Sequence, residues 1–248
     1  MKIGKVEIRV EKPALVGVVA DKEWEKAGWS MADILEVRLD HLLGGSVGPK
    51  SDGSENTLIE TASSFIQGVT EKAKKPVILT IRRPEESEPG QKAFLPDKAR
   101  LDLFSSLMPL ADAVDIEVDS VIAAKVVRLA KKTRRTRVIG SYHNFQRVPP
   151  DRVLYEKMQR ADNLGTDIFK LACWAEERED IVRLFNFCHT FSKKHIVCVI
   201  AMGKRNTLFR MVAPLFGSAL VYVSLTTKTA PGQPEIKGFA EDFHRFYP

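Results

Sequence analysis

Eight short apolar runs, most of them rich in Val and Ile, recur along the chain at a regular interval. Near-continuous apolar runs of this length are typical of parallel strands that are buried on both faces of a sheet. Consecutive parallel strands need a crossover between them, so a chain of this kind alternates strands with helices. The runs lie at 14–20, 34–39, 77–81, 113–118, 138–142, 167–172, 196–201 and 219–225.

The segments between these runs carry apolar residues at three- and four-residue spacings, which predicts helices. Eight strands, each followed by a helix, indicate an α/β fold of the (β/α)8 TIM-barrel type, and we predict a single domain over 1–248. A doubly wound open sheet fits less well, because no G-x-G-x-x-G follows the first run. Residues 1–10 alternate like an extra N-terminal strand at the bottom of the barrel. The predicted helices lie at 58–69, 96–111, 120–132, 152–164, 176–192, 207–216 and 237–246, with a weaker one at 21–29.

The composition of the 248 residues, 44% hydrophobic and 28% charged, excludes disorder of the whole chain. No apolar run approaches the roughly 18 residues of a membrane span. The first ten residues also lack the apolar stretch of a signal peptide, so we expect a cytoplasmic protein with no membrane partner. Cys173, Cys188 and Cys198 form no C-x-x-C pair, which favours buried free thiols over a disulfide or a zinc site.

Basic residues outnumber acidic ones by 38 to 32, which gives a formal net charge of +6. The run at 131–137 holds many of the cations in one place and has two interpretations: a nucleic-acid patch, or a solvated helix end. We favour the helix end, because the run follows an apolar-periodic stretch and has no interleaved aromatic residues. No nucleic-acid partner is therefore expected.

Three long loops follow predicted strands, at 43–56, 82–95 and 226–234. The first is rich in Gly and Ser. All three would lie at the C-terminal face of a barrel, where barrel enzymes have their active sites. We therefore expect the functional site at that face.

Lys170 and His143 are the two residues in this region that most strongly suggest chemistry. Lys170 lies in the apolar sequence Asp-Ile-Phe-Lys-Leu-Ala, and His143 directly follows the run at 138–142. Burial disfavours an ammonium, and a neutral amine can attack a ketone to form a Schiff base. Lys170 could equally be a lysine that snorkels or pairs with a carboxylate. Because the two strands are neighbours, His143 could face the same pocket and transfer protons there.

Charged side chains also recur at the ends of three other predicted strands. Two-residue alternation places Glu36, Arg38 and Asp40 on one face, and likewise Asp115, Glu117 and Asp119. Arg82 ends the third strand, with Glu86 four residues later. Each set could be structural, but their coincidence across neighbouring strands favours a polar pocket.

Two further segments could bind an anionic ligand. Arg210 lies early in the predicted helix at 207–216 and could hold a carboxylate through two hydrogen bonds. The preceding loop around Gly203 could instead hold a phosphate. The stretch at 230–233, Ala-Pro-Gly-Gln, could form a hinge whose Gln233 amide recognises hydroxyl or carboxylate oxygens, or it could be a surface turn.

Taken in order, these motifs resemble those of the type I 3-dehydroquinate dehydratases of the shikimate pathway, over nearly the whole chain. The family's Glu-x-Arg-x-Asp is similar to Glu36, Arg38 and Asp40, and its Asp-x-Glu to Asp115 and Glu117. Its Arg followed by Glu matches Arg82 and Glu86, its Ser-x-His matches Ser141 and His143, and its lysine matches Lys170. Its Met-Gly loop, later arginine and (Ser/Thr)-Ala-Pro-Gly-Gln match Met202, Gly203, Arg210 and 229–233.

Four positions depart from the family pattern. Ser87 and Glu88 stand where two glycines are usual, so Glu85 or Glu88 could take the role of Glu86. Phe209 precedes Arg210 in place of the usual serine. Thr229 stands where serine is common and keeps the hydroxyl.

The resemblance implies a lyase that dehydrates 3-dehydroquinate to 3-dehydroshikimate. Lys170 would form a Schiff base with the ketone, His143 would act as general base and then general acid, and Glu86 would orient the imidazole. No metal and no organic cofactor would be needed, because the lysine supplies the electron sink. A homodimer is possible. The substrate-binding residues would be Glu36, Arg38, Arg82, Arg210, Thr229 and Gln233.

Three alternatives remain at this point. One is another Schiff-base barrel enzyme, such as a class I aldolase, which would usually act on a phosphorylated substrate. The others are a barrel without catalytic activity and a basic nucleic-acid binder that uses 131–137.

Overall fold

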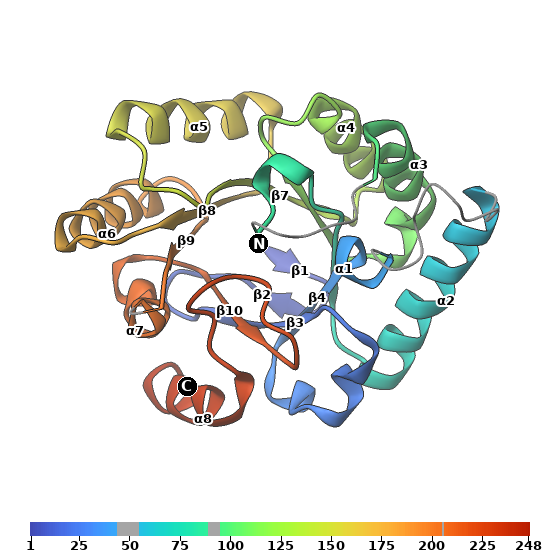
Figure 1. The fold of residues 1–248 in the computed structure, drawn as a ribbon, viewed down its shortest axis with the longest axis horizontal. Coiled ribbons are helices and arrows are strands. Elements are labelled where there is room, and N and C mark those ends of the chain that lie inside the picture. Colours follow the sequence, from blue (N-terminus) through green and yellow to red (C-terminus); the bar gives the residue numbers. More distant parts are fainter. Residues whose placement is uncertain (44–54, 89–94, 205) are drawn as a thin grey trace.

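The computed structural model describes residues 1–43, 55–88, 95–204 and 206–248, and its centre is an eight-stranded parallel barrel (Figure 1). The strand order is β10-β3-β4-β5-β6-β7-β8-β9, and every pair in this order is parallel. A bridge between Val197 and Ser218 brings β9 beside β10 at the remaining seam. The predicted (β/α)8 barrel is therefore confirmed. The strands are β3 (Ala14–Val19), β4 (Ile34–Arg38), β5 (Val77–Thr80), β6 (Ala113–Glu117), β7 (Arg137–Asn144), β8 (Ile168–Trp174), β9 (Val197–Met202) and β10 (Leu220–Ser224).

Helices surround this barrel, as the ribbon shows (Figure 1). The seven main predicted helices are present. The weaker, short helix predicted at 21–29 is present as two short 3-10 helices, Lys22–Lys26 and Trp29–Met31, which follow β3. The α-helices are α1 (Leu39–Leu43), α2 (Glu55–Ala73), α3 (Asp97–Leu107), α4 (Ala123–Thr133), α5 (Asp151–Leu164), α6 (Arg178–Ser192), α7 (Thr207–Val212) and α8 (Ile236–Phe246), and further 3-10 helices lie at Pro84–Glu86, Met108–Leu110 and Ala213–Phe216.

The N-terminal residues form a small hairpin in place of one extra strand. β1 (Lys2–Ile3) and β2 (Val6–Glu7) pair antiparallel. Ile3 and Ile8 are buried and pack with the first residues of the barrel strands, including Ile34 and Ile168. The hairpin therefore closes the amino end of the barrel, and Figure 1 shows it within the ring of strands.

Side chains that point into the barrel form layers of four, each from alternate strands, as the geometry of such barrels requires. One layer holds Ile34, Ala113, Ile168 and Leu220, which belong to one buried apolar cluster. Two residues further along the same strands, the next layer holds Glu36, Asp115, Lys170 and Tyr222, all of them buried. The barrel interior therefore changes from apolar to charged within one step of the strand alternation. We call these the lower layer and the upper layer.

Several other predictions can be compared with the structure. The basic run at 131–137 spans the end of α4 and the start of β7, with Arg134 as the left-handed C-cap, which agrees with a helix end. The three cysteines are buried and free. No helix in the described parts of the chain is long and apolar enough to cross a membrane. The loop predicted at 43–56 lies largely outside the described residues, as do 89–94 of the loop at 82–95. The single domain over 1–248 stays a prediction.

Candidate functional site

A cavity opens at the carboxyl ends of the strands, where the sequence predicts the functional site. The nine predicted site residues line this one cavity, although they come from seven different strands, helices and loops. Val18, Ile200 and Met202 add apolar wall from β3 and β9. The nine residues are Glu36, Arg38, Arg82, Glu86, His143, Lys170, Arg210, Thr229 and Gln233.

Lys170 lies at the bottom of this cavity, within the upper layer. Its Nζ lies 3.0 Å from Asp115 Oδ2 and 3.3 Å from Glu36 Oε1, and 3.9 Å from the centroid of the Tyr222 ring. The hydroxyl of Thr80 donates a hydrogen bond to Glu36 Oε1 as well, at 2.9 Å. The amine is therefore buried but held by two carboxylates and an aromatic face, which satisfies the requirement that a buried cation be paired.

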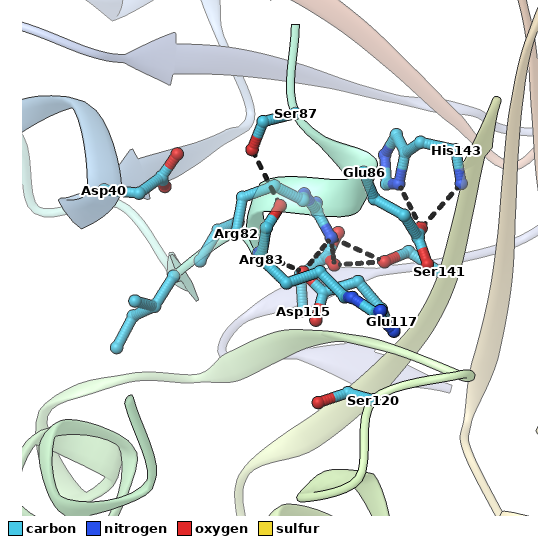
Figure 2. Close-up of polar contacts among 12 residues, drawn as sticks. Asp40, Arg82, Arg83, Glu86, Ser87, Asp115, Glu117, Ser120, Ser141 and His143 are labelled. Atoms are coloured by element: carbon cyan, nitrogen blue, oxygen red, sulfur yellow. Dashed lines mark hydrogen bonds and ion pairs between the residues drawn. The ribbon is translucent and has the colours of Figure 1, made fainter. Parts of the chain in front are cut away.

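Arg82 connects Asp115 with the next carboxylate along β6 (Figure 2). Its Nη1 donates to Asp115 Oδ1 at 2.9 Å, to Glu117 Oε1 at 3.0 Å and to Ser141 Oγ at 2.8 Å. Burial alone would raise the pKa of Asp115, but the Arg82 guanidinium and the Lys170 ammonium hold it well below its usual range. Asp115 is therefore a fixed negative charge between two cations.

His143 projects from β7 on the side of the cavity near Glu86, as Figure 2 shows. Glu86 Oε2 accepts the backbone N–H of His143 at 2.7 Å and lies 3.2 Å from Nδ1 of the ring. Burial, with Arg82 and Lys170 nearby, lowers the pKa of His143 well below its usual value. Burial and the neighbouring Glu117 raise the pKa of Glu86 to about 8. The imidazole is therefore neutral at pH 7 and available as a base.

Among the three glutamates that the sequence left open, Glu86 is the one that contacts His143. Glu85 is exposed and pairs with Arg83 at 2.8 Å. Glu88 is half-buried and lines the cavity, but within the described ranges it forms no hydrogen bond or ion pair with the imidazole.

Two acidic residues lie elsewhere than the alternation predicted. Asp40 was expected on a strand face with Glu36, but β4 ends at Arg38 and Asp40 lies in α1. Both carboxylate oxygens of Asp40 accept hydrogen bonds from the Arg38 guanidinium. Asp119 lies beyond the end of β6 and pairs with Lys157 at 2.7 Å and with Arg160 at 3.4 Å. In both cases the strand ends before the pattern does, so alternation no longer decides direction.

Arg210 comes from α7 and is buried without an acidic partner in the described structure. Its Nη1 donates to the Tyr222 carbonyl oxygen at 3.4 Å, while Nε and Nη2 have no hydrogen-bond partner among the described residues. Burial lowers the pKa of Arg210 to about 10. A buried cation with two free donors is a receptor for an anion, and a carboxylate matches its geometry.

The loop after β10 covers the same side of the cavity. Gln233 Oε1 accepts from the backbone N–H of Thr229 at 2.8 Å and from its hydroxyl at 3.2 Å, and both residues line the cavity. Gly232 has a φ of +73°, and a Cβ there would lie 2.1 Å from the Gly203 carbonyl oxygen, so only glycine fits. The Gly203 N–H donates to the Pro231 carbonyl oxygen at 3.2 Å and is therefore occupied in place of binding a phosphate.

Sequence reasoning missed one residue that lines this cavity, Tyr222, and one that supports it from outside, Arg100. Tyr222 is the fourth member of the upper layer and lines the cavity. The sequence signal that could have identified it is its position two residues after Leu220 in an apolar strand. Arg100, inside α3, is buried and donates through Nη2 to Glu117 Oε2 at 2.5 Å and to the Ile81 carbonyl oxygen at 2.8 Å. An arginine in an amphipathic helix gives no signal that it points toward the barrel.

No group of three or more His, Cys, Asp and Glu side chains in the described ranges has the arrangement of a metal site. The chemistry that the cavity offers comes from its own side chains: an amine, a neutral imidazole, fixed carboxylates and free guanidinium donors. This set can form an imine with a carbonyl compound, move a proton, and bind a carboxylate.

Comparison with known proteins identifies the family. The family model for type I 3-dehydroquinase matches residues 19–243. The chain is 31% identical over 242 residues to the 3-dehydroquinate dehydratase of Methanococcoides burtonii. This alignment covers 96% of this chain and 95% of that protein. It is 34% identical over 245 residues to that of Methanosarcina barkeri, with 94% of each covered.

Solved structures agree with this comparison. The crystal structure of the 3-dehydroquinate dehydratase from Aquifex aeolicus superposes with a TM-score of 0.75 at 30% identity and covers 94% of this chain and 99% of that one. The type I enzyme from Clostridium difficile, with covalent modified comenic acid, has a TM-score of 0.82 at 20% identity, over 100% of this chain and 97% of that one, and supports the fold. The chain belongs to the type I 3-dehydroquinate dehydratase family of lyases.

Proposed function

We propose that this lyase dehydrates 3-dehydroquinate to 3-dehydroshikimate through a Schiff base on Lys170, with His143 as general base and general acid. The observation that carries the proposal is the juxtaposition of a buried amine and a neutral imidazole in one cavity. The family match supports dehydration of 3-dehydroquinate in the shikimate pathway.

The first stage joins Lys170 to the substrate. The Nζ amine attacks the ketone carbon, and the carbinolamine then loses the ketone oxygen as water to leave an iminium ion. The neutral imidazole of His143 can take the proton that the ammonium must lose before attack. Asp115 and Glu36 beside Nζ balance the positive charge that the iminium keeps.

The second stage removes water from the substrate ring. The iminium withdraws electrons, so the neighbouring carbon becomes acidic and His143 removes a proton from it to give an enamine. The enamine expels the hydroxyl one carbon further on, and His143 returns its proton to that leaving group. Hydrolysis of the conjugated iminium then releases 3-dehydroshikimate and restores the amine.

The remaining side chains would orient the reactants. Glu86 holds the imidazole through Nδ1 and through the His143 backbone N–H. Arg210, with two free donors, would bind the substrate carboxylate. Hydroxyls of the ring would contact Glu36, Arg38, Arg82, Thr229 and Gln233, and the loop at 226–234 would exclude water that hydrolyses the imine early.

A class I aldolase is the competing Schiff-base enzyme. The Gly203 N–H already donates to the Pro231 carbonyl oxygen, so it is not free to bind a phosphate group. A phosphorylated substrate is therefore less well accommodated, which favours the dehydratase. The cytoplasmic location and the homodimer stay predictions.

Borohydride trapping tests the proposal, because it reduces an imine to a stable secondary amine. We expect intact-protein mass spectrometry with 3-dehydroquinate to show one adduct, which peptide mapping places on Lys170. Lys170→Ala should form no adduct and turn over no substrate. Lys157→Ala is the matched control, since Lys157 also has a carboxylate partner and lies 5.1 Å from a tyrosine ring centroid, but outside the cavity. Undiminished turnover by Lys170→Ala would exclude the Schiff-base mechanism.

A further inference from the structure

The hydroxyl of Tyr222 is buried and has no hydrogen-bond partner in the described part of the chain. The whole residue is only 3% exposed. A hydroxyl in this state has lost its water without gaining a protein partner, which destabilises the free protein. Unpaired groups of this kind are rare in native structures, so each requires a reason. One such reason is a bound ligand that forms the missing hydrogen bond.

The position of Tyr222 indicates the ligand. Its side chain lines the cavity, and its ring centroid lies 3.9 Å from Lys170 Nζ. In the proposed reaction the imine carbon is bonded to this same nitrogen. The substrate atoms next to the imine would therefore lie beside the Tyr222 ring.

The protonation state of Tyr222 fits a hydrogen-bond donor. Burial, and the negative charges of Glu36 and Asp115, raise the pKa of Tyr222 well above its usual value. The phenol therefore keeps its proton wherever the enzyme is folded. A donor needs an acceptor, and the two carbons beside the ketone of 3-dehydroquinate differ here: one loses the proton in the reaction, and the other carries a hydroxyl.

We propose that Tyr222 is a further substrate-contacting residue, whose hydroxyl donates a hydrogen bond to the substrate hydroxyl next to the imine carbon. The face of its ring lies against the cationic imine and stabilises it. No bond forms or breaks at Tyr222, so its contribution is to position and select the substrate. This inference rests on the proposed function, since it requires the substrate on Lys170.

Tyr222→Phe removes only the hydroxyl and tests the inference in two ways. We expect kcat/KM for 3-dehydroquinate to fall about tenfold, because one buried hydrogen bond is lost. We expect the thermal midpoint of the free enzyme to stay the same or rise, because an unpaired group disappears. Tyr247→Phe is the control: its hydroxyl donates to the Met211 carbonyl oxygen, so this variant should lose stability and keep kcat/KM.

The 4-deoxy analogue of the substrate, which lacks the hydroxyl beside the ketone, identifies the contact. Its inhibition constant should be equal for the parent and Tyr222→Phe. A variant with parental kcat/KM would overturn the inference, and so would an equal loss of affinity for substrate and analogue. Borohydride trapping of the parent separates the two proposals: no adduct on Lys170 contradicts the proposed function, whereas an adduct with parental kinetics of Tyr222→Phe contradicts only the role of Tyr222.

Discussion

The lower and upper layers of the barrel interior are built on the same four strands, two residues apart, and serve different purposes. Members of the lower layer are at most 1% exposed and members of the upper layer at most 4%, so burial does not distinguish them. The difference lies in what the side chains need from their neighbours. Ile34, Ala113, Ile168 and Leu220 need only contact, whereas Glu36, Asp115 and Lys170 need opposite charges.

This comparison teaches that the backbone does not decide where the chemistry lies. Burial of the lower layer stabilises the fold by roughly 25 cal/mol for each Å² of apolar surface. A buried ion pair contributes little net stability, because desolvation offsets the attraction between the charges. The charged layer is therefore better explained by function than by stability, and substitutions in the two regions should separate activity from folding.

The largest separation is expected above the upper layer, at His143. His143→Ala should lower kcat by about a hundredfold to ten-thousandfold, since it removes the proposed general acid and base. The Lys170 adduct should still form and accumulate, because the amine and its carboxylate partners remain. Rapid-quench mass spectrometry would measure the accumulated imine. Turnover at the parental rate would assign the proton transfer to another residue.

The reverse effect is expected in the lower layer. Ile168→Ala should lower the free energy of unfolding by about 2–5 kcal/mol, because it leaves a cavity among packed side chains. Its kcat per folded molecule should change less than threefold, although Lys170 is only two residues away. Chemical denaturation and active-site titration would measure the two quantities. Ile168→Val, with a smaller loss of stability, is the matched control; a large loss of kcat without unfolding would show that the layers are coupled.

The sequence predicted the barrel well, because parallel strands buried on both faces leave a strong apolar pattern. All eight runs are strands, and the nine site residues line one cavity. Most of the exceptions lie where tertiary structure decides direction. The two-residue alternation of side chains could not show that β4 ends at Arg38, so that Asp40 lies in helix α1. Nor could it show that Asp119 lies beyond the end of β6. Tyr222 resembled an ordinary apolar strand residue, and only the layer geometry places it beside Lys170.

The smallest expected effect concerns the pH dependence of stability at Glu86. Its pKa is raised to about 8 in the folded protein, mainly by burial, from 4.5 in the unfolded chain. The folded state thus holds a proton that the unfolded state releases, so this contribution is fully present below pH 4.5 and is lost as pH rises through 8. Glu86→Gln cannot ionise and should escape this loss.

Between pH 5 and pH 9 the parent should therefore lose at least about 1 kcal/mol of stability relative to Glu86→Gln, since one pKa unit corresponds to about 1.4 kcal/mol. Denaturation of both proteins at a series of pH values measures the difference. The lowered pKa of His143 acts in the opposite direction, below pH 6.5, and is present in both proteins, so it largely cancels. Ile168→Val, in the lower layer, should shift stability by the same amount at every pH. Parallel pH curves for the parent and Glu86→Gln would mean that Glu86 is ionised in the folded enzyme, and the neutral imidazole would then face a carboxylate that favours its protonation.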